Sequence, residues 1–152
     1  MAGVFIHITG NAFPRLEELR RKSTNTQFHS VLDEIGAALD SDTIIRFTKE
    51  QAPDGNKWVQ SEAARLGRSS KPGQKRKSDL TLTDQRNLAD SVTHNVTGNV
   101  LEHGLGEEYA AIHHFGGKTG RNHSVTLPSR KLIGIEAIQE AEINDIVEDW
   151  LI

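Results

Sequence analysis

The residues best suited to chemistry in this chain of 152 residues are its seven histidines, because it contains no cysteine. Without cysteine there is no disulfide, no thiolate metal site and no cysteine nucleophile. Two histidines that share a zinc ion on a helix usually stand four residues apart, whereas His113 and His114 are adjacent and point about 100° apart. The chain has no His-Glu-x-x-His motif. We expect these two histidines, and likewise His103 and His123, to be satisfied by backbone partners near helix ends, and we predict neither a metal nor a cofactor.

Signature motifs of hydrolases and nucleotide-binding proteins are also missing. No Gly-x-Ser-x-Gly nucleophile elbow occurs. The stretch 116–119 (Gly-Gly-Lys-Thr) imitates the end of a phosphate-binding loop, but Ile112 stands where that loop needs a glycine. Acidic pairs occur at 107–108 and 148–149 in stretches typical of solvated surface. The sequence therefore predicts a protein that is not an enzyme, with a hydrolase that uses His113 as a base as a minor alternative.

Charge is distributed unevenly along the chain, although the formal net charge is only −3. Residues 1–64 carry 7 basic and 9 acidic side chains, and residues 78–152 carry 5 basic and 12 acidic ones. Between them, six basic residues occur without an acidic one: Arg65, Arg68, Lys71, Lys75, Arg76 and Lys77. Residues 66–79, the basic loop, have almost no apolar content and are predicted to be flexible.

The basic loop suits contact with an acidic protein surface or with DNA phosphates, although a solvated loop without a partner is the simplest interpretation. It has no aromatic residue on which bases would stack, which argues against recognition of single strands. Residues 136–149 show the opposite bias, with six acidic residues and no basic one. Such a helix face is usually a solvated surface, and the alternative is a partner for a basic surface on a neighbouring molecule.

Apolar periodicity and turn residues predict an α+β domain that spans residues 1–152. In the first half, β-branched residues predict a strand over 4–9, and Pro14 opens a short helix over 15–22. Apolar residues from Phe28 onward predict a helix over 26–50, either one long bent helix or two abutting ones, with an N-cap among residues 23–25. A type I turn at 53–55 should end it, with Trp58 packing this turn onto the body.

Shorter elements are expected in the second half. They are a short helix capped by Thr83, a hairpin over 92–105 that turns at Gly98-Asn99, a helix over 107–115 closed by Gly116-Gly117, and a strand over 123–127. A final helix over 135–151 should present an apolar stripe of Ile135, Ile138, Ile146 and Trp150. We therefore expect a long N-terminal helix and a C-terminal helix packed on a small antiparallel sheet. No apolar run approaches the roughly 20 residues of a membrane span, and no signal peptide is expected.

Four stretches of the chain together resemble the phage virion morphogenesis family, also called the tail completion protein family, of Mu-like and related tailed phages. They are Phe47 with Pro53-Asp54-Gly55 and Trp58; Leu80, Leu82, Leu88 and Ser91; the run Tyr109–Gly117; and Leu127-Pro128-Ser129-Arg130 with Leu132-Ile133-Gly134. The third is the specific one, because it closely matches a Tyr-Ala-x-Ile-His-Gln-Phe-Gly-Gly signature. The order of the stretches agrees from about residue 28 to residue 152. Asp84-Gln85, His114 and Lys131-Leu132 depart from the family pattern.

The resemblance implies a structural protein of virion assembly, similar to ring-forming subunits that complete the tail or join it to the head. The implied partners are further copies of itself and the tail tube, tail terminator or neck proteins, with packaged DNA as a candidate contact of the basic loop. The implied location is the host cytoplasm during assembly and then the virion. Residues that hold the fold or form interfaces are expected to be Trp58, Tyr109, His113, Phe115 and Arg130. The rival interpretation is a small nucleic-acid-binding or nucleic-acid-processing protein that uses the basic loop.

Overall fold

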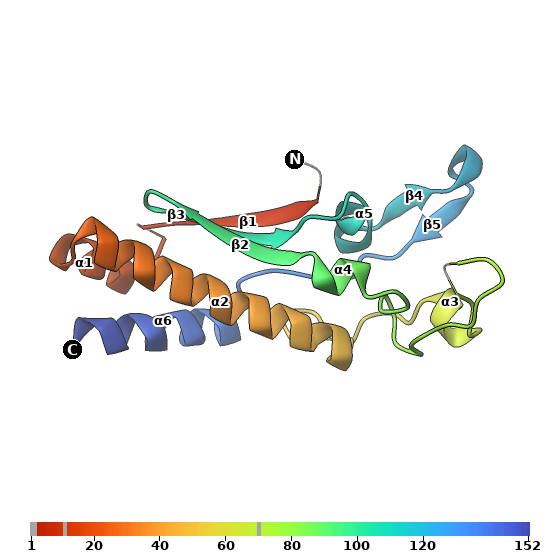
Figure 1. The fold of residues 1–152 in the computed structure, drawn as a ribbon, viewed down its shortest axis with the longest axis horizontal. Coiled ribbons are helices and arrows are strands. Elements are labelled where there is room, and N and C mark those ends of the chain that lie inside the picture. The colour runs from red at the N-terminus through yellow and green to blue at the C-terminus, as the bar shows by residue number, and fades with distance from the viewer. Residues whose placement is uncertain (1–2, 11, 70) are drawn as a thin grey trace.

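The computed structural model describes residues 3–10, 12–69 and 71–152 and has the predicted α+β fold, with a long N-terminal and a C-terminal helix and a small antiparallel sheet (Figure 1). The helices are α1 (Pro14–Lys22), α2 (Asn25–Lys49), α3 (Glu62–Arg65), α4 (Asn87–Asp90), α5 (Ala110–Phe115) and α6 (Ala137–Leu151). The strands are β1 (Val4–Thr9), β2 (Val92–Thr97), β3 (Val100–Leu105), β4 (Gly117–Thr119) and β5 (Val125–Leu127). No helix in the described ranges is both long and apolar enough to cross a membrane.

The main sheet has the strand order β1-β3-β2 and is antiparallel throughout. The predicted hairpin is confirmed, because β2 and β3 pair around a turn at Gly98, whose φ of 58° suits glycine. The register places His94 opposite His103. Strand β1 pairs with the other edge of β3, so the central strand is the last of the three in the sequence.

Helix α2 runs along one face of this sheet, with α6 beside it and α1 at one end of the pair (Figure 1). It is one continuous helix of 25 residues, which decides between the two predicted alternatives. Thr24 caps its start: the Gln27 N–H donates to Thr24 Oγ1 (3.2 Å), and the Thr24 N–H donates to Gln27 Oε1 (2.9 Å). Glu50 ends it in the left-handed region, with φ 52°, and the predicted turn follows, with the Gly55 N–H donating to the Ala52 carbonyl (2.9 Å).

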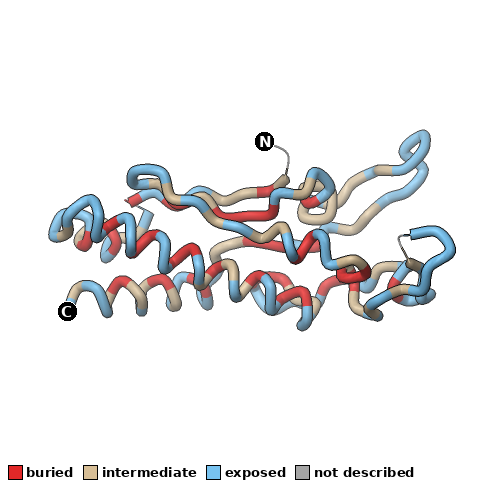
Figure 2. The backbone as a smooth tube through the Cα atoms, in the orientation of Figure 1, coloured by how far each residue is buried: buried red, intermediate tan, exposed pale blue. Residues whose placement is uncertain are grey.

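Two groups of buried residues lie along α2, and buried stretches concentrate between the helices and the sheet (Figure 2). One group, centred on Phe28 and Leu101, joins the first half of α2 to α1, α6 and the sheet. The other surrounds Phe47 and Trp58, whose rings meet edge to face at 5.3 Å. The prediction for Trp58 is confirmed in part: it packs on the body, and its Nε1–H donates to the Lys131 carbonyl (3.0 Å).

The predicted apolar stripe of the last helix is wrong at Ile138 and at Trp150, which is 39% exposed and donates from Nε1 to the Glu34 carboxylate (2.7 Å). Ile143 and Val147 face the core, and Ile135 and Ile146 pack against it, but the side chain of Ile138 is 64% exposed. Ile138 stands five residues before Ile143 and so falls on the opposite side of α6.

The short helix expected after Thr83 begins later than predicted. Thr83 is buried and does not cap a helix; its hydroxyl donates to the Leu80 carbonyl (2.9 Å), within the turn that closes the basic loop. Helix α4 starts at Asn87, after Arg86 in the left-handed region. A side chain already bonded to the preceding turn is not available to the helix that follows.

A second, two-stranded sheet of β4 and β5 extends away from the body beyond α5 (Figure 1). Strand β4 has no counterpart among the predictions, because Gly-Lys-Thr lacks a strand pattern and Gly117 was expected to belong to a turn. Gly116 does end α5 as predicted, with φ 72°. The predicted strand over 123–127 is two residues too long, since His123 lies in a 3-10 turn and β5 begins at Val125.

Candidate functional site

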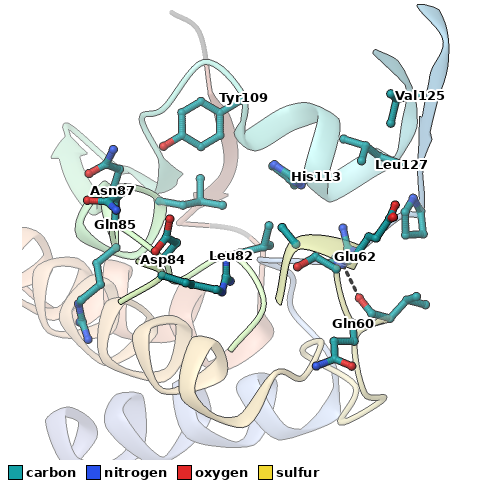
Figure 3. A pocket seen from close by; sticks show the side chains of 18 of the residues that line it. Gln60, Glu62, Leu82, Asp84, Gln85, Asn87, Tyr109, His113, Val125 and Leu127 are labelled. Atoms are coloured by element: carbon teal, nitrogen blue, oxygen red, sulfur yellow. Dashed lines mark hydrogen bonds between the residues drawn. The ribbon is translucent and has the colours of Figure 1, made fainter. Parts of the chain in front are cut away.

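A groove of about 670 Å³ opens between α3, α4, α5 and the β4–β5 hairpin (Figure 3). It is lined by residues 59–63, 84–88 and 125–128, and by Arg76, Leu82, Tyr109, His113 and Arg130. Leucine, valine and proline side chains form much of its walls, and polar and charged side chains from all of these segments stand among them. A concave surface of this kind and size is typical of binding sites.

Arg130 joins two sides of the groove. Its side chain is 3% exposed, and its Nε–H donates to the carbonyl oxygen of Val59 at 2.6 Å. Its backbone N–H donates to the carbonyl of His113 at 2.8 Å. Arg130 therefore ties the segment after Trp58 to the last turn of α5. Burial lowers the pKa of Arg130.

Tyr109 caps the start of α5 and His113 lies in its last turn, and both side chains project towards the same space (Figure 3). Their rings meet edge to face, with centroids 6.1 Å apart. Tyr109 remains 40% exposed and bonds through its side chain to Asn87. Burial raises the pKa of Tyr109, and the charge of Glu107 adds to this. Burial lowers the pKa of His113, and the positive charge of Arg130 adds to that effect, so His113 is favoured as a neutral imidazole that can donate or accept a hydrogen bond.

Three polar side-chain atoms in this groove are buried without a hydrogen-bond partner in the described part of the chain. They are Arg76 Nε, Gln85 Nε2 and His113 Nδ1, and their residues all line the groove. A buried polar group that is left unpaired costs about 1–3 kcal/mol. Their gathering in one groove suits a surface that a binding partner completes.

The basic loop folds back against the groove instead of extending away from it. The carboxylate of Asp84 accepts hydrogen bonds from the Ser69 hydroxyl (3.0 Å) and the Lys77 N–H (2.8 Å). The guanidinium of Arg76 donates to the carbonyls of Arg68 (3.1 Å) and Leu80 (2.7 Å). The predicted flexibility of the loop stays a prediction, but its two ends are held together.

The structure separates the residues singled out from the sequence into three groups. Tyr109, His113 and Arg130 meet in the groove. Trp58 lies in the core, and Phe115, 70% exposed, is not part of the groove lining. Of the basic residues, Arg76 lines the groove, Arg65 belongs to α3, and Arg68, Lys71, Lys75 and Lys77 are exposed on the loop.

Leu82, Asp84 and Gln85 complete the groove and were not predicted to belong to it. In the sequence, Asp84-Gln85 stands out only as a departure from the family pattern. An aspartate and a glutamine beside a basic stretch look like ordinary loop residues, and only the fold shows that Asp84 is 6% exposed.

A second polar cluster, the histidine–aspartate network, lies between α2 and the β2–β3 hairpin. The carboxylate of Asp40 accepts from Nδ1 of His94 (2.6 Å) and from Nδ1 of His103 (2.9 Å). His103 Nε2 pairs with the Thr43 hydroxyl (3.2 Å), and His94 Nε2 with the Asp33 carboxylate (3.2 Å). The expectation that His103 would have a backbone partner near a helix end is therefore wrong; His114 is satisfied in that way, because its Nδ1 accepts from the Leu132 N–H (3.1 Å).

The two histidines of this network differ in charge preference. Burial opposes the charged form of both, but at His94 the hydrogen bonds and charges of Asp40 and Asp33 outweigh it and raise the pKa. At His103 burial outweighs Asp40, and the nearby positive charge of Arg46 adds to it, so the pKa is lowered. This assigns a protonated His94 that donates from both nitrogens and a neutral His103 that accepts from Thr43.

Acidification is expected to destabilise the protein. The pKa values of His103, His113 and His114 are lowered from 6.5, so below 6.5 the unfolded chain binds more protons at these sites and stability is lost as the pH falls. The raised pKa of His94 acts in the opposite direction: its contribution is complete below 6.5 and is lost as the pH rises. Because three histidines lose their stabilising contribution on acidification and only His94 opposes them, we expect a lower urea midpoint at about pH 5.5 than at about pH 7.5. A midpoint that rises on acidification would contradict this assignment.

The fold and the groove define a small α+β protein with an open amphipathic binding surface at one end. Residues 11–152 match the model of the phage virion morphogenesis family, and the chain belongs to that family. It is 39% identical over 69 residues to the Mu-like prophage FluMu G protein 2 of Haemophilus influenzae; the alignment spans 45% of this chain and 50% of that protein. No solved structure matches the chain. The resemblance found in the four sequence stretches is thereby confirmed, and the protein has a structural role in phage morphogenesis.

Proposed function

We propose that this protein is a non-enzymatic subunit that completes the phage tail or joins it to the head, and that it acts as a ring of identical copies. Its partners are further copies of itself and proteins of the tail tube, the tail terminator or the neck. It assembles in the host cytoplasm and remains in the virion. The family membership supports the assembly role.

The observation that carries the proposal is the groove with its three unpaired buried polar atoms. A surface with apolar walls and unpaired hydrogen-bonding groups gains stability when a complementary protein surface covers it. Such a surface suits a subunit that is completed by assembly. Identical subunits that meet through unlike faces close into a ring when the rotation between them permits it.

Complementation of a phage that lacks this gene tests the role. Without the protein, electron microscopy should show finished heads beside tails that are unjoined or irregular at one end, and expression of the chain in trans should restore complete infectious particles. Leu82→Asp, which places a charge in the apolar wall of the groove, should fail to restore them. Lys49→Glu, an exposed change outside the groove, should restore them as well as the original chain. Normal particles from the phage without the gene, or a block before heads and tails form, would exclude the proposal.

A second candidate function, nucleic-acid binding, is favoured by one observation, the exposed lysines of the basic loop. Deletion of residues 68–77 and measurement of duplex-DNA affinity across a salt series separates the two. Strong binding that this deletion abolishes, in a protein that stays monomeric, would favour the nucleic-acid function. Weak binding that the deletion leaves unchanged would favour the structural one.

A further inference from the structure

The unpaired atoms of the groove define the chemistry of what it binds. Arg76 Nε and Gln85 Nε2 carry hydrogen and are donors only, and His113 Nδ1 can donate or accept. The groove lining also contains the cationic side chains of Arg76 and Arg86, which favour a partner with oxygen acceptors, and the walls around Leu82 and Leu127 favour an apolar side chain beside them. The groove thus fits a surface in which carboxylates surround an apolar residue.

The basic loop at the edge of the groove carries lysines that form no ion pair with an acidic side chain of the described residues. Lys71, Lys75 and Lys77 are exposed, and none of them forms an ion pair with a described residue. Arg76 belongs both to this loop and to the groove lining, so the positive surface and the groove are continuous. An acidic partner surface is favoured here.

The outward face of α6 has the matching chemistry. Ile138, Asp145 and Asp149 follow one another at intervals of about two turns and one turn, so they lie on the side of α6 opposite the buried Ile143 and Val147. Ile138 is 64% exposed, and Asp145 and Asp149 are exposed without an ion pair to a described residue.

Carboxylates are crowded on this part of the molecule. Burial raises the pKa of Glu142, and the charges of Asp42 and Asp145 raise it further against the opposing effect of Arg46. A cationic partner would relieve this repulsion between like charges.

These two surfaces lie apart in the molecule: α6 runs from its middle to the end where the C-terminus lies, and α3 with the basic loop lies at the opposite end (Figure 1). One copy therefore cannot bring its own α6 to its own groove. Two copies that meet head to tail can do so, and the pair still presents one free groove and one free α6 face.

We propose that the groove and basic loop of one subunit receive the outward face of α6 of a second copy, with Ile138 against the apolar walls and Asp145 and Asp149 against the lysines of the loop. This rests on the proposed ring, and it names the two faces that meet. DNA is disfavoured as the occupant, because a phosphate backbone has no apolar side chain to cover the walls around Leu82 and Leu127.

Charge reversal of each face tests the proposal. Lys75→Glu with Lys77→Glu reverses two of the exposed lysines of the loop, and Asp145→Lys with Asp149→Lys reverses the two acids of the helix face. All four side chains are exposed, so circular dichroism should show an unchanged fold. Native mass spectrometry and sedimentation then give the size of each species, and Lys49→Glu is the matched control for a change of charge outside both faces.

We expect the original chain and the control to form a closed oligomer that weakens with added salt, and each reversed variant to be monomeric. Each reversed variant alone pairs like charges, but mixing the two should restore an oligomer of alternating subunits. The altered loop of one variant then meets the altered α6 face of the other, and the two unaltered faces meet as in the original chain. A chain that carries all four substitutions should regain the oligomer, because both faces exchange sign together. A groove variant (Leu82→Asp) mixed with an α6 variant (Ile138→Asp) should yield a dimer and no larger species, because one intact face of each kind remains.

The proposal is overturned if the original chain is monomeric at the highest concentration reached, if either reversed variant keeps the oligomer, or if the fourfold variant stays monomeric. It is also overturned if the loop variant loses duplex-DNA binding while the oligomer is unaffected. Particle assembly separates this failure from failure of the proposed function. If both reversed variants still complete particles in the complementation assay, the assembly role stands and only the assignment of faces falls.

Discussion

Replacing Asp40 with alanine should lower the free energy of unfolding by about 3 kcal/mol. The carboxylate accepts hydrogen bonds from both His94 and His103, and His103 is 1% exposed. Without Asp40, the buried Nδ1–H of His103 loses its acceptor and His94 loses one of its two partners. Urea denaturation at neutral pH, followed by circular dichroism, measures the loss.

Asp33→Ala is the matched control, since it removes the other carboxylate bonded to His94 from the same helix. The side chain of Asp33 is 65% exposed, so this change should cost less than about 1 kcal/mol. Equal losses for the two variants would show that the network does not depend on burial. A small loss for Asp40→Ala would show that the shared carboxylate is not what joins α2 to the hairpin.

Gly36→Ala should also destabilise the protein, by about 2 kcal/mol, although alanine favours helix by about 1 kcal/mol over glycine. A Cβ at this position would overlap the ring of His94, with Cγ at 2.5 Å, and would press on Leu101 Cδ1 at 2.9 Å. The ring cannot move aside easily, because Asp40 and Asp33 hold its two nitrogens. Glycine is therefore required here for the close approach of α2 to β2.

The double-mutant cycle with His94→Ala tests this reason. In the His94→Ala background the same Gly36→Ala change should cost less than about 0.5 kcal/mol, because the space taken by the ring is free. Ser41→Ala, an exposed substitution on the same helix, should change stability by only a few tenths of a kcal/mol. If Gly36→Ala costs the same with and without the ring of His94, the contact is not the cause.

Much of the secondary structure could be predicted, because its signals lie within short stretches. The apolar spacing from Phe28 onward, the Thr24–Gln27 pair and the turn that ends at Gly55 define α2 and its limits. Gly98 sets the hairpin and its register, and this register already places His94 opposite His103. Neither residue was identified as one of a pair, because the aspartate that joins them comes from α2, more than 50 residues earlier.

The groove could be predicted only in part. Tyr109, His113 and Arg130 drew attention through the resemblance to a family, but nothing in their spacing brings Leu82, Gln85 and the wall from β5 to the same place. The chain alone also misplaced Ile138 in the core and Thr83 at a helix start. In both cases the local pattern permitted the prediction, and packing against distant segments reversed it.

The sequence by itself determined the α+β class, the long helix, the hairpin and the concentration of opposite charges in two separate stretches, because hydrophobic period, caps and turns act between near neighbours. Only the tertiary structure decided that the basic loop borders a groove and that Ile138 and two acids of α6 face outward, away from the core. Those relations depend on which surfaces of α2, α6 and the sheet are buried against one another, and burial is a property of the whole chain.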